Sequence, residues 1–71
     1  MERRAKELIK KMIDADIPIK EQTGYLAELL GKGSQYVRAR MTGKASWTFR
    51  EAQIIGEALS IPQEDMWNTF R

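Results

Sequence analysis

The sequence predicts a small all-α protein of five helices. Apolar residues recur at three- and four-residue spacing through most of the chain, which is the period of a helix with one buried face. Two of the periodic stretches end at glycines, Gly31 and Gly43, where helices commonly stop. No segment shows the strict apolar–polar alternation of a half-buried strand. We expect helices at about residues 3–14, 19–30, 34–41, 48–59 and 62–70, in a single compact domain of residues 1–71.

The first two predicted helices form the scaffold. The apolar stripe of the first comprises Ala5, Leu8, Ile9, Met12 and Ile13. Pro18 disfavours the helical conformation in the residue before it and suits the first turn of a new helix. The second helix is therefore expected to begin near Ile19 and to keep its apolar period to Leu30. Gly24 inside it costs about 1 kcal/mol relative to alanine.

The third predicted helix follows the second after a three-residue turn. Gly33 is a poor helix former, whereas Ser34 offers a side-chain oxygen that can cap the first free amides, so we expect the helix to start at Ser34. At about 100° per residue, one face carries Ser34, Val37 and Met41, and the opposite face carries Gln35, Arg38, Ala39 and Thr42. The first face is expected to pack against Leu26 and Leu30, and the second to face outward.

The last two predicted helices have clear start signals. Thr48 followed by Glu51 is a capping box, and Trp47 and Ala52 are placed as its hydrophobic staple, so Trp47 is expected to pack in the core rather than to stack on a base. The residues expected to face the core are Ala52, Ile55, Ala58 and Leu59, with Phe49 or Ile54 at the edge. Pro62 opens the last helix.

Composition argues against an enzyme. The chain has no cysteine and no histidine, which excludes a disulfide framework, thiolate metal sites and histidine chemistry. The acidic pairs Asp14 with Asp16 and Glu64 with Asp65 stand near predicted helix ends, where carboxylates act as caps or dipole partners. The GKGS sequence at 31–34 lacks the spacing of a phosphate loop. We expect no catalytic residues, metal, cofactor or small-molecule ligand.

We also expect no targeting signal, because no apolar run approaches the roughly 20 residues of a membrane span and the charged opening lacks the apolar core of a signal peptide. We expect a cytoplasmic protein that contacts no membrane.

Basic charge is concentrated in the middle of the chain. Residues 32–50 carry five basic residues and no acid, and these are Lys32, Arg38, Arg40, Lys44 and Arg50. Residues 51–71 carry four acids against Arg71 alone. This distribution favours contact of the middle segment with phosphate groups. The alternative is a solvated basic face that has no partner.

The middle of the chain resembles a known DNA-binding motif. The residues that carry the resemblance are Leu26, Ala27, Gly31, Val37, Gly43 and Lys44. They look like the helix-turn-helix of the Cro/CI-type (XRE-like) repressors of bacteria and their phages, and the similarity to short phage-type members extends to Phe70. Two residues depart from the family pattern: Lys32 stands where the family usually has valine or isoleucine, and Arg40 where many members bury an apolar residue.

The resemblance implies a λ-repressor-like fold and sequence-specific binding of an operator in double-stranded DNA, as a Cro-like repressor of phage or mobile-element genes. Residues 34–41 would enter the major groove. The expected base-contacting residues are Ser34, Gln35, Arg38 and Ala39. The expected backbone-contacting residues are Thr23, Tyr25, Lys32, Thr42, Lys44 and Ser46. For Tyr25, packing within the protein is an equal alternative. Arg38 would be the main discriminator, since guanidinium pairs with guanine, while the amide of Gln35 suits adenine. The alternative role for Arg38 is an ion pair with an acid of a neighbouring element.

The apolar residues near the C-terminus suggest a homodimer, at least on DNA. They are Ile61, Met66, Trp67 and Phe70, and an exposed aromatic patch is typical of an interface. The alternative is that all four close the core. Two other functions remain open: a protein-interaction module, such as an antirepressor or adaptor with the same fold, and the antitoxin of a toxin–antitoxin pair. In each case the expected location is the cytoplasm of a bacterial or phage-infected cell.

Overall fold

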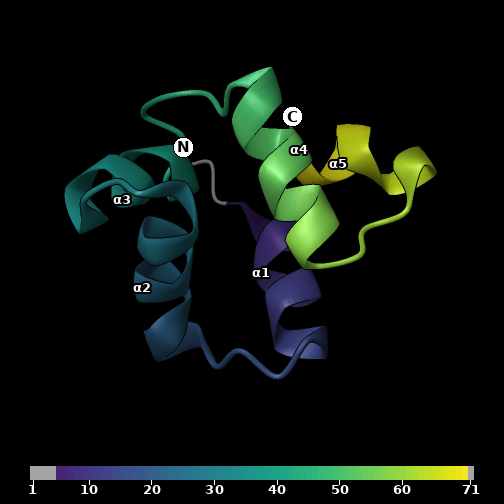
Figure 1. Cartoon of the computed structure of the whole chain (residues 1–71), viewed down its shortest axis with the longest axis horizontal. Coiled ribbons are helices and arrows are strands. Elements are labelled where there is room, and N and C mark those ends of the chain that lie inside the picture. The colour runs from purple at the N-terminus through teal and green to yellow at the C-terminus, as the bar shows by residue number, and fades with distance from the viewer. Residues whose placement is uncertain (1–4, 71) are drawn as a thin grey trace.

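The computed structural model describes residues 5–70, which form five α-helices and one short 3-10 turn, with no strand among them. The elements are α1 (Lys6–Asp14), α2 (Ile19–Leu30), α3 (Ser34–Met41), α4 (Phe49–Ala58), η1 (Gln63–Asp65) and α5 (Met66–Phe70) (Figure 1). The predicted all-α, five-helix fold class is confirmed. The second and third helices have the predicted bounds, whereas the expected start of the first at residue 3 lies outside the described residues.

Helix α2 packs against α1, α3 and α4, while α5 packs against α1 and α4 (Figure 1). The first four helices each supply at least one fully buried side chain to the core, and these are Leu8, Met12, Leu26, Val37 and Ile55. At about 25 cal/mol per Å² of buried apolar surface, this shared core is the main term that holds so short a chain together.

One polar side chain also lies in this core. Gln22 of α2 is 2% exposed, and its Nε2 donates hydrogen bonds to the carbonyl oxygens of Ile17 at 3.0 Å and Ile9 at 3.3 Å. Because both carbonyls belong to α1 or the loop after it, the satisfied amide fixes the start of α2 against the end of α1.

Helices α1 to α4 all end in the same hydrogen-bonded turn. One residue at each of these helix ends has a positive φ, and these residues are Asp16, Gly31, Gly43 and Ser60. After α2, for example, the Gly31 N–H donates to the Glu28 oxygen at 3.3 Å and the Lys32 N–H to the Ala27 oxygen at 3.0 Å. This is the Schellman pattern. The two predicted glycine stops are therefore confirmed, and α1 and α4 use non-glycine residues in the same conformation.

The start of α3 differs from the prediction. Its cap residue is Gly33, in an extended conformation with φ −76° and ψ 163°, and no side chain caps the helix. Ser34 already belongs to the helix and is exposed, so the expected capping role of Ser34 and its place on the packed face were wrong.

The capping box of α4 is confirmed, since the Thr48 Oγ1 accepts from the Glu51 N–H at 3.1 Å and the Glu51 carboxylate accepts from the Thr48 N–H at 2.9 Å.

Three apolar residues assigned to the buried faces are exposed. Ile13 is 47% exposed, because Leu8 and Met12 centre the buried face of α1 and Ile13 lies a further 100° round the helix. Of the two alternatives for the core edge of α4, Ile54 is half-buried, whereas Phe49 is 80% exposed because it lies about 120° from Ile55. Ala58, in the last turn of α4, is exposed as well.

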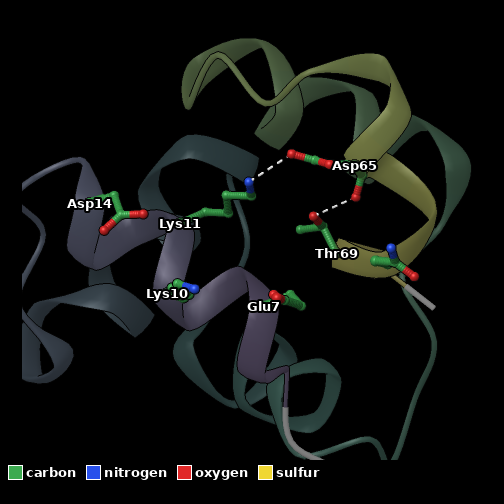
Figure 2. A pocket seen from close by; sticks show the side chains of 7 residues that line it. Glu7, Lys10, Lys11, Asp14, Asp65 and Thr69 are labelled. Atoms are coloured by element: carbon green, nitrogen blue, oxygen red, sulfur yellow. Dashed lines mark hydrogen bonds and ion pairs between the residues drawn. The ribbon is translucent and has the colours of Figure 1, made fainter.

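Helix α5 is attached to α1 by a polar contact (Figure 2). The Lys11 Nζ lies 2.9 Å from the Asp65 Oδ2, and the Thr69 hydroxyl donates to the Asp65 carbonyl oxygen at 2.7 Å. The hydrogen bond to Asp65 raises the pKa of Lys11 above its ordinary value. The acid near the start of the last helix therefore pairs with α1, and a polar hollow of about 250 Å³ lies beside the pair.

Candidate nucleic-acid interface

The outward face of α3 forms a shallow hollow of about 270 Å³. Its lining residues are Gln35, Arg38, Ala39, Thr42 and Lys44. Gln35, Arg38 and Lys44 are exposed, whereas Ala39 and Thr42 are half-buried. The structure thus brings together three of the four residues predicted to contact bases and two of those predicted to contact the DNA backbone. The hollow combines two cations and an amide with an apolar surface that is larger than its polar surface.

Buried contacts on the other side of α3 hold this face outward. Val37 is fully buried in the core beside Leu26, and Met41 packs against the same cluster. The Ala5 N–H donates to the Met41 carbonyl oxygen at 3.1 Å, which attaches the end of α3 to the start of α1. The predicted division of α3 into a packed and an outward face is therefore confirmed except at Ser34.

The turn after α3 places Lys44 beside the helix. Gly43 has a φ of 87°, and the chain reverses so that the Lys44 N–H donates to the Ala39 carbonyl oxygen at 2.9 Å. The Ala45 N–H donates to the same oxygen at 3.1 Å. Lys44 therefore reaches the hollow from a residue outside the helix, and Ser46 follows it as an exposed residue of the same loop.

Other predicted contact residues lie elsewhere or are engaged within the chain. Thr42 donates its hydroxyl to the carbonyl oxygens of Arg38 at 3.0 Å and of Ala39 at 3.4 Å, so its proton is used inside α3. Thr23 is half-buried in α2. Tyr25 packs against the core and lines a separate hollow along α2.

The two departures from the family pattern meet at one aromatic ring. The Lys32 Nζ lies 5.2 Å from the centroid of the Tyr36 ring, and the Arg40 Cζ lies 3.8 Å from it. Lys32 is exposed, so it does not fill the core position that an apolar residue usually occupies. Both cations are positioned for favourable interaction with the ring.

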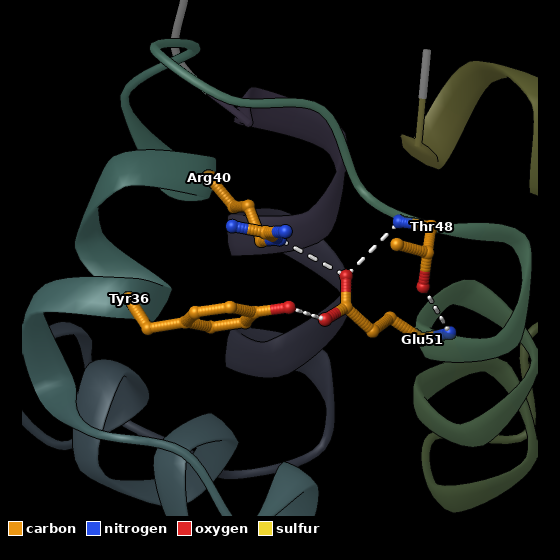
Figure 3. Close-up of polar contacts among 4 residues, drawn as sticks. All are labelled: Tyr36, Arg40, Thr48 and Glu51. Atoms are coloured by element: carbon orange, nitrogen blue, oxygen red, sulfur yellow. Dashed lines mark hydrogen bonds and ion pairs between the residues drawn. The ribbon is translucent and has the colours of Figure 1, made fainter.

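Arg40 also joins a buried polar network that the sequence did not predict (Figure 3). The Glu51 carboxylate accepts hydrogen bonds from Arg40 Nε at 3.0 Å and from the Tyr36 hydroxyl, in addition to the Thr48 amide. The side chains of Arg40 and Glu51 are 15% and 9% exposed. In the sequence, Glu51 was fully explained by its place in the capping box. The one sequence feature that could have revealed the network is that Tyr36 and Arg40, four residues apart, share a helix face beside the buried Val37.

The network shifts the pKa values of its acidic members. Burial opposes ionisation of Glu51, but hydrogen bonds from Thr48, Tyr36 and Arg40 outweigh it and lower the pKa of Glu51 below its ordinary value. The hydrogen bond to Glu51, with burial, raises the pKa of Tyr36. At neutral pH the network therefore holds an ionised carboxylate and a protonated phenol.

Arg38, unlike Arg40, makes no ion pair within residues 5–70. The alternative role for Arg38, an ion pair with a neighbouring element, is thus not formed in the described part of the chain. Its side chain lines the hollow and is exposed, so its guanidinium is accessible to a ligand.

Of the four residues predicted at a dimer interface, Trp67 alone is largely exposed, at 75%. Ile61 is buried, and Phe70 packs edge-to-face on Trp47 with ring centroids 6.1 Å apart. Met66 is half-buried and lies against Gly56, where an added Cβ would come within 2.8 Å of its Sδ. Trp47 is half-buried against the core, as predicted.

Within residues 5–70, no three acidic, histidine or cysteine side chains gather as metal ligands. None of the helices in that range combines the length and apolar character needed to cross a bilayer. Comparison of the chain with protein-family models, with curated proteins and with solved structures found no match.

Proposed function

We propose that the chain binds double-stranded DNA sequence-specifically, as a Cro-like transcriptional regulator of phage or mobile-element genes, and that α3 is its recognition helix. The observation that carries the proposal is the hollow on α3, where Gln35, Arg38, Ala39 and Lys44 lie on one exposed face. The opposite face is fixed in the core through Val37. A helix with one supported face and one polar, basic face has the shape required for the major groove.

The residues of the hollow match distinct groups on DNA. Arg38 has two donors for the O6 and N7 acceptors of guanine, and Gln35 has a donor and an acceptor for adenine. The methyl group of Ala39 suits the methyl group of thymine. Lys44 and Ser46 lie in the loop that follows the C-terminal end of α3. With α3 in the groove, this loop would lie beside the phosphates at the edge of the groove. Each matched base pair would contribute about 1–3 kcal/mol of discrimination.

The proposed assembly on DNA is a homodimer that reads two half-sites about one helical turn apart. Of the residues predicted at the dimer interface, Trp67, which is 75% exposed, is the one proposed to make that contact. We propose no enzymatic activity and no cofactor. The function requires only that the two copies present their α3 helices on the same side of the duplex.

The direct test is selection of bound duplexes from a random pool at about 0.1 M salt, followed by salt titration of the selected duplex. The proposal expects a palindrome with half-sites about 10 base pairs apart and an affinity that falls steeply as salt rises. An unenriched pool with only weak, salt-sensitive binding would contradict it.

The exposed Trp67 also favours a second candidate, a protein-interaction module such as an antirepressor or adaptor. Under this alternative, the selection experiment yields no sequence, and substitution of Trp67 rather than of Arg38 abolishes the activity. An antitoxin would share the DNA function and would not be separated from a repressor by the same selection.

A further inference from the structure

The contact between α3 and α4 is made by side chains alone. Among these two helices, no Cα of one lies within 8 Å of a Cα of the other, whereas α3 packs closely on α2. The space between them is spanned by Tyr36 and Arg40 from α3 and by Glu51 from α4 (Figure 3). Tyr36 and Arg40 of α3 therefore link that helix directly to the Glu51 carboxylate of α4, in addition to the core that Val37 and Ile55 share.

The same carboxylate also fixes the start of α4. One oxygen, Oε1, accepts from Arg40 Nε at 3.0 Å and from the Thr48 N–H at 2.9 Å, while Oε2 accepts from the Tyr36 hydroxyl. Thr48 ends the loop that carries Lys44 and Ser46. Glu51 thus contacts two separate elements. Through Tyr36 and Arg40 it anchors α3, which carries Arg38, and through Thr48 it anchors the end of the loop that carries Lys44 and Ser46.

Three features restrict the network. The side chains of Arg40 and Glu51 are 15% and 9% exposed, so solvent competes weakly for the hydrogen bond between them. The guanidinium of Arg40 lies over the Tyr36 ring, 3.8 Å from its centroid, which restricts both side chains. No buried side-chain nitrogen or oxygen in the described residues lacks a hydrogen-bond partner, so no unsatisfied polar group favours another arrangement of these side chains.

We infer that Glu51 is a positioning residue for DNA recognition: through Tyr36, Arg40 and Thr48 it aligns α3 with the loop of residues 44–46. This inference rests on the proposed DNA function for its consequence, but the alignment itself is a property of the free protein. Recognition needs contact groups held within about 0.5 Å of their productive geometry, which a loosened α3 would not provide.

The test uses Glu51→Gln, which keeps the size of the side chain and removes its charge. Glu57→Gln, at an exposed position of the same helix, makes the same change in net charge and is the matched control. Tyr36→Phe is a milder second variant that removes only the hydroxyl. Amide hydrogen exchange is measured in the free proteins. We expect exchange in α3 to quicken about tenfold in Glu51→Gln, with α1 and α2 little changed, and Glu57→Gln to match the original protein.

DNA affinity supplies a readout that a merely structural role would not move. Removal of a negative charge from the protein by itself strengthens DNA binding, because it reduces repulsion by the phosphates. The Glu57→Gln control measures the size of this charge effect. We expect Glu51→Gln instead to weaken binding to the selected duplex about tenfold, and to flatten the preference at the base read by Arg38, at a temperature where the variant is fully folded.

Three results would overturn the inference: exchange that quickens equally in all helices, exchange that does not change, or unchanged base preference in a folded Glu51→Gln. If the original protein selects no DNA sequence, the proposed function fails, and the exchange measurement still decides whether Glu51 holds α3. The two failures are therefore distinguishable.

Discussion

The Arg40 guanidinium and the Glu51 carboxylate meet at 3.0 Å from two helices that have no close backbone contact. Neither side chain is more than 15% exposed, so the pair is a buried one. Buried pairs are costly to break from one side, because the remaining charge is left without its partner. Glu51 is therefore the residue whose protonation should matter most to the stability of this fold.

The first prediction concerns acid. The folded-state pKa of Glu51 is lowered below its ordinary value of 4.5, so Glu51 contributes stability above about pH 4.5 and loses it as pH falls through the folded pKa. Glu51→Gln should lower the free energy of unfolding by about 1–2 kcal/mol at pH 7 and by less at pH 3. Urea denaturation at both pH values checks this, with Glu57→Gln as control. An equal loss at both pH values would show that the charge is not responsible.

The second prediction compares two glycines of the same region. Gly24 lies within α2, and an added Cβ would meet no atom within 4 Å, so Gly24→Ala should stabilise the protein by about 1 kcal/mol. Gly31 has a φ of 69°, and Gly31→Ala should destabilise it by about 1–2 kcal/mol. In thermal denaturation, 1 kcal/mol corresponds to a shift of about 4–8 °C in Tm for a chain of this size. Tm shifts of the same sign in the two variants would contradict the helical conformation of Gly24 or the left-handed conformation of Gly31.

The third prediction concerns the end of α4. Ser60 has a φ of 55° at the position where glycine is favoured, because the Ile61 N–H bonds to the Gly56 oxygen at 2.9 Å in the Schellman turn. Ser60→Gly should raise the free energy of unfolding by about 0.5–1 kcal/mol. Ser60→Ala keeps the unfavourable Cβ and serves as the control. Stabilisation by alanine and not by glycine would be inconsistent with the left-handed conformation.

The fourth prediction concerns Trp67. Its side chain is 75% exposed, so Trp67→Ser should change the free energy of unfolding of the monomer by less than about 0.5 kcal/mol. The same substitution should weaken dimerisation on DNA, which sedimentation of the protein–duplex complex measures. A complex of unchanged stoichiometry and affinity would remove Trp67 from the proposed interface.

The helix boundaries were largely predictable because they are set by local chemistry. Gly31 and Gly43 supply the left-handed conformation that ends α2 and α3, and Thr48 with Glu51 forms a cap within four residues. Each of these signals involves residues close in sequence. The turn at Ser60 uses the same geometry without glycine, and its conformation was therefore not evident from residue type.

The residues that were not predictable depend on tertiary contacts. Glu51 had a sufficient local explanation as a capping residue, so nothing in its neighbourhood pointed to Tyr36 and Arg40 on another helix. Phe49 was expected at the core edge because it is apolar, but its direction from α4 leaves it exposed. The grouping of Arg38 with Lys44 in one hollow followed from helical spacing together with the turn at Gly43, and both were available in the sequence.

The central proposal is that the outward face of α3 recognises base pairs by direct contact. The most direct test measures the affinity of three variants for the selected duplex and for duplexes with single base-pair substitutions. Arg38→Ala should cost about 1–3 kcal/mol and abolish discrimination at one base pair, whereas Lys44→Ala should weaken binding to all duplexes alike and reduce the salt dependence. Lys20→Ala, in the first turn of α2 and so at the opposite end of that helix from the turn that leads to α3, should change neither property. If Arg38→Ala instead weakens all duplexes equally, Arg38 is a phosphate contact and the account of α3 as a reader of sequence is contradicted.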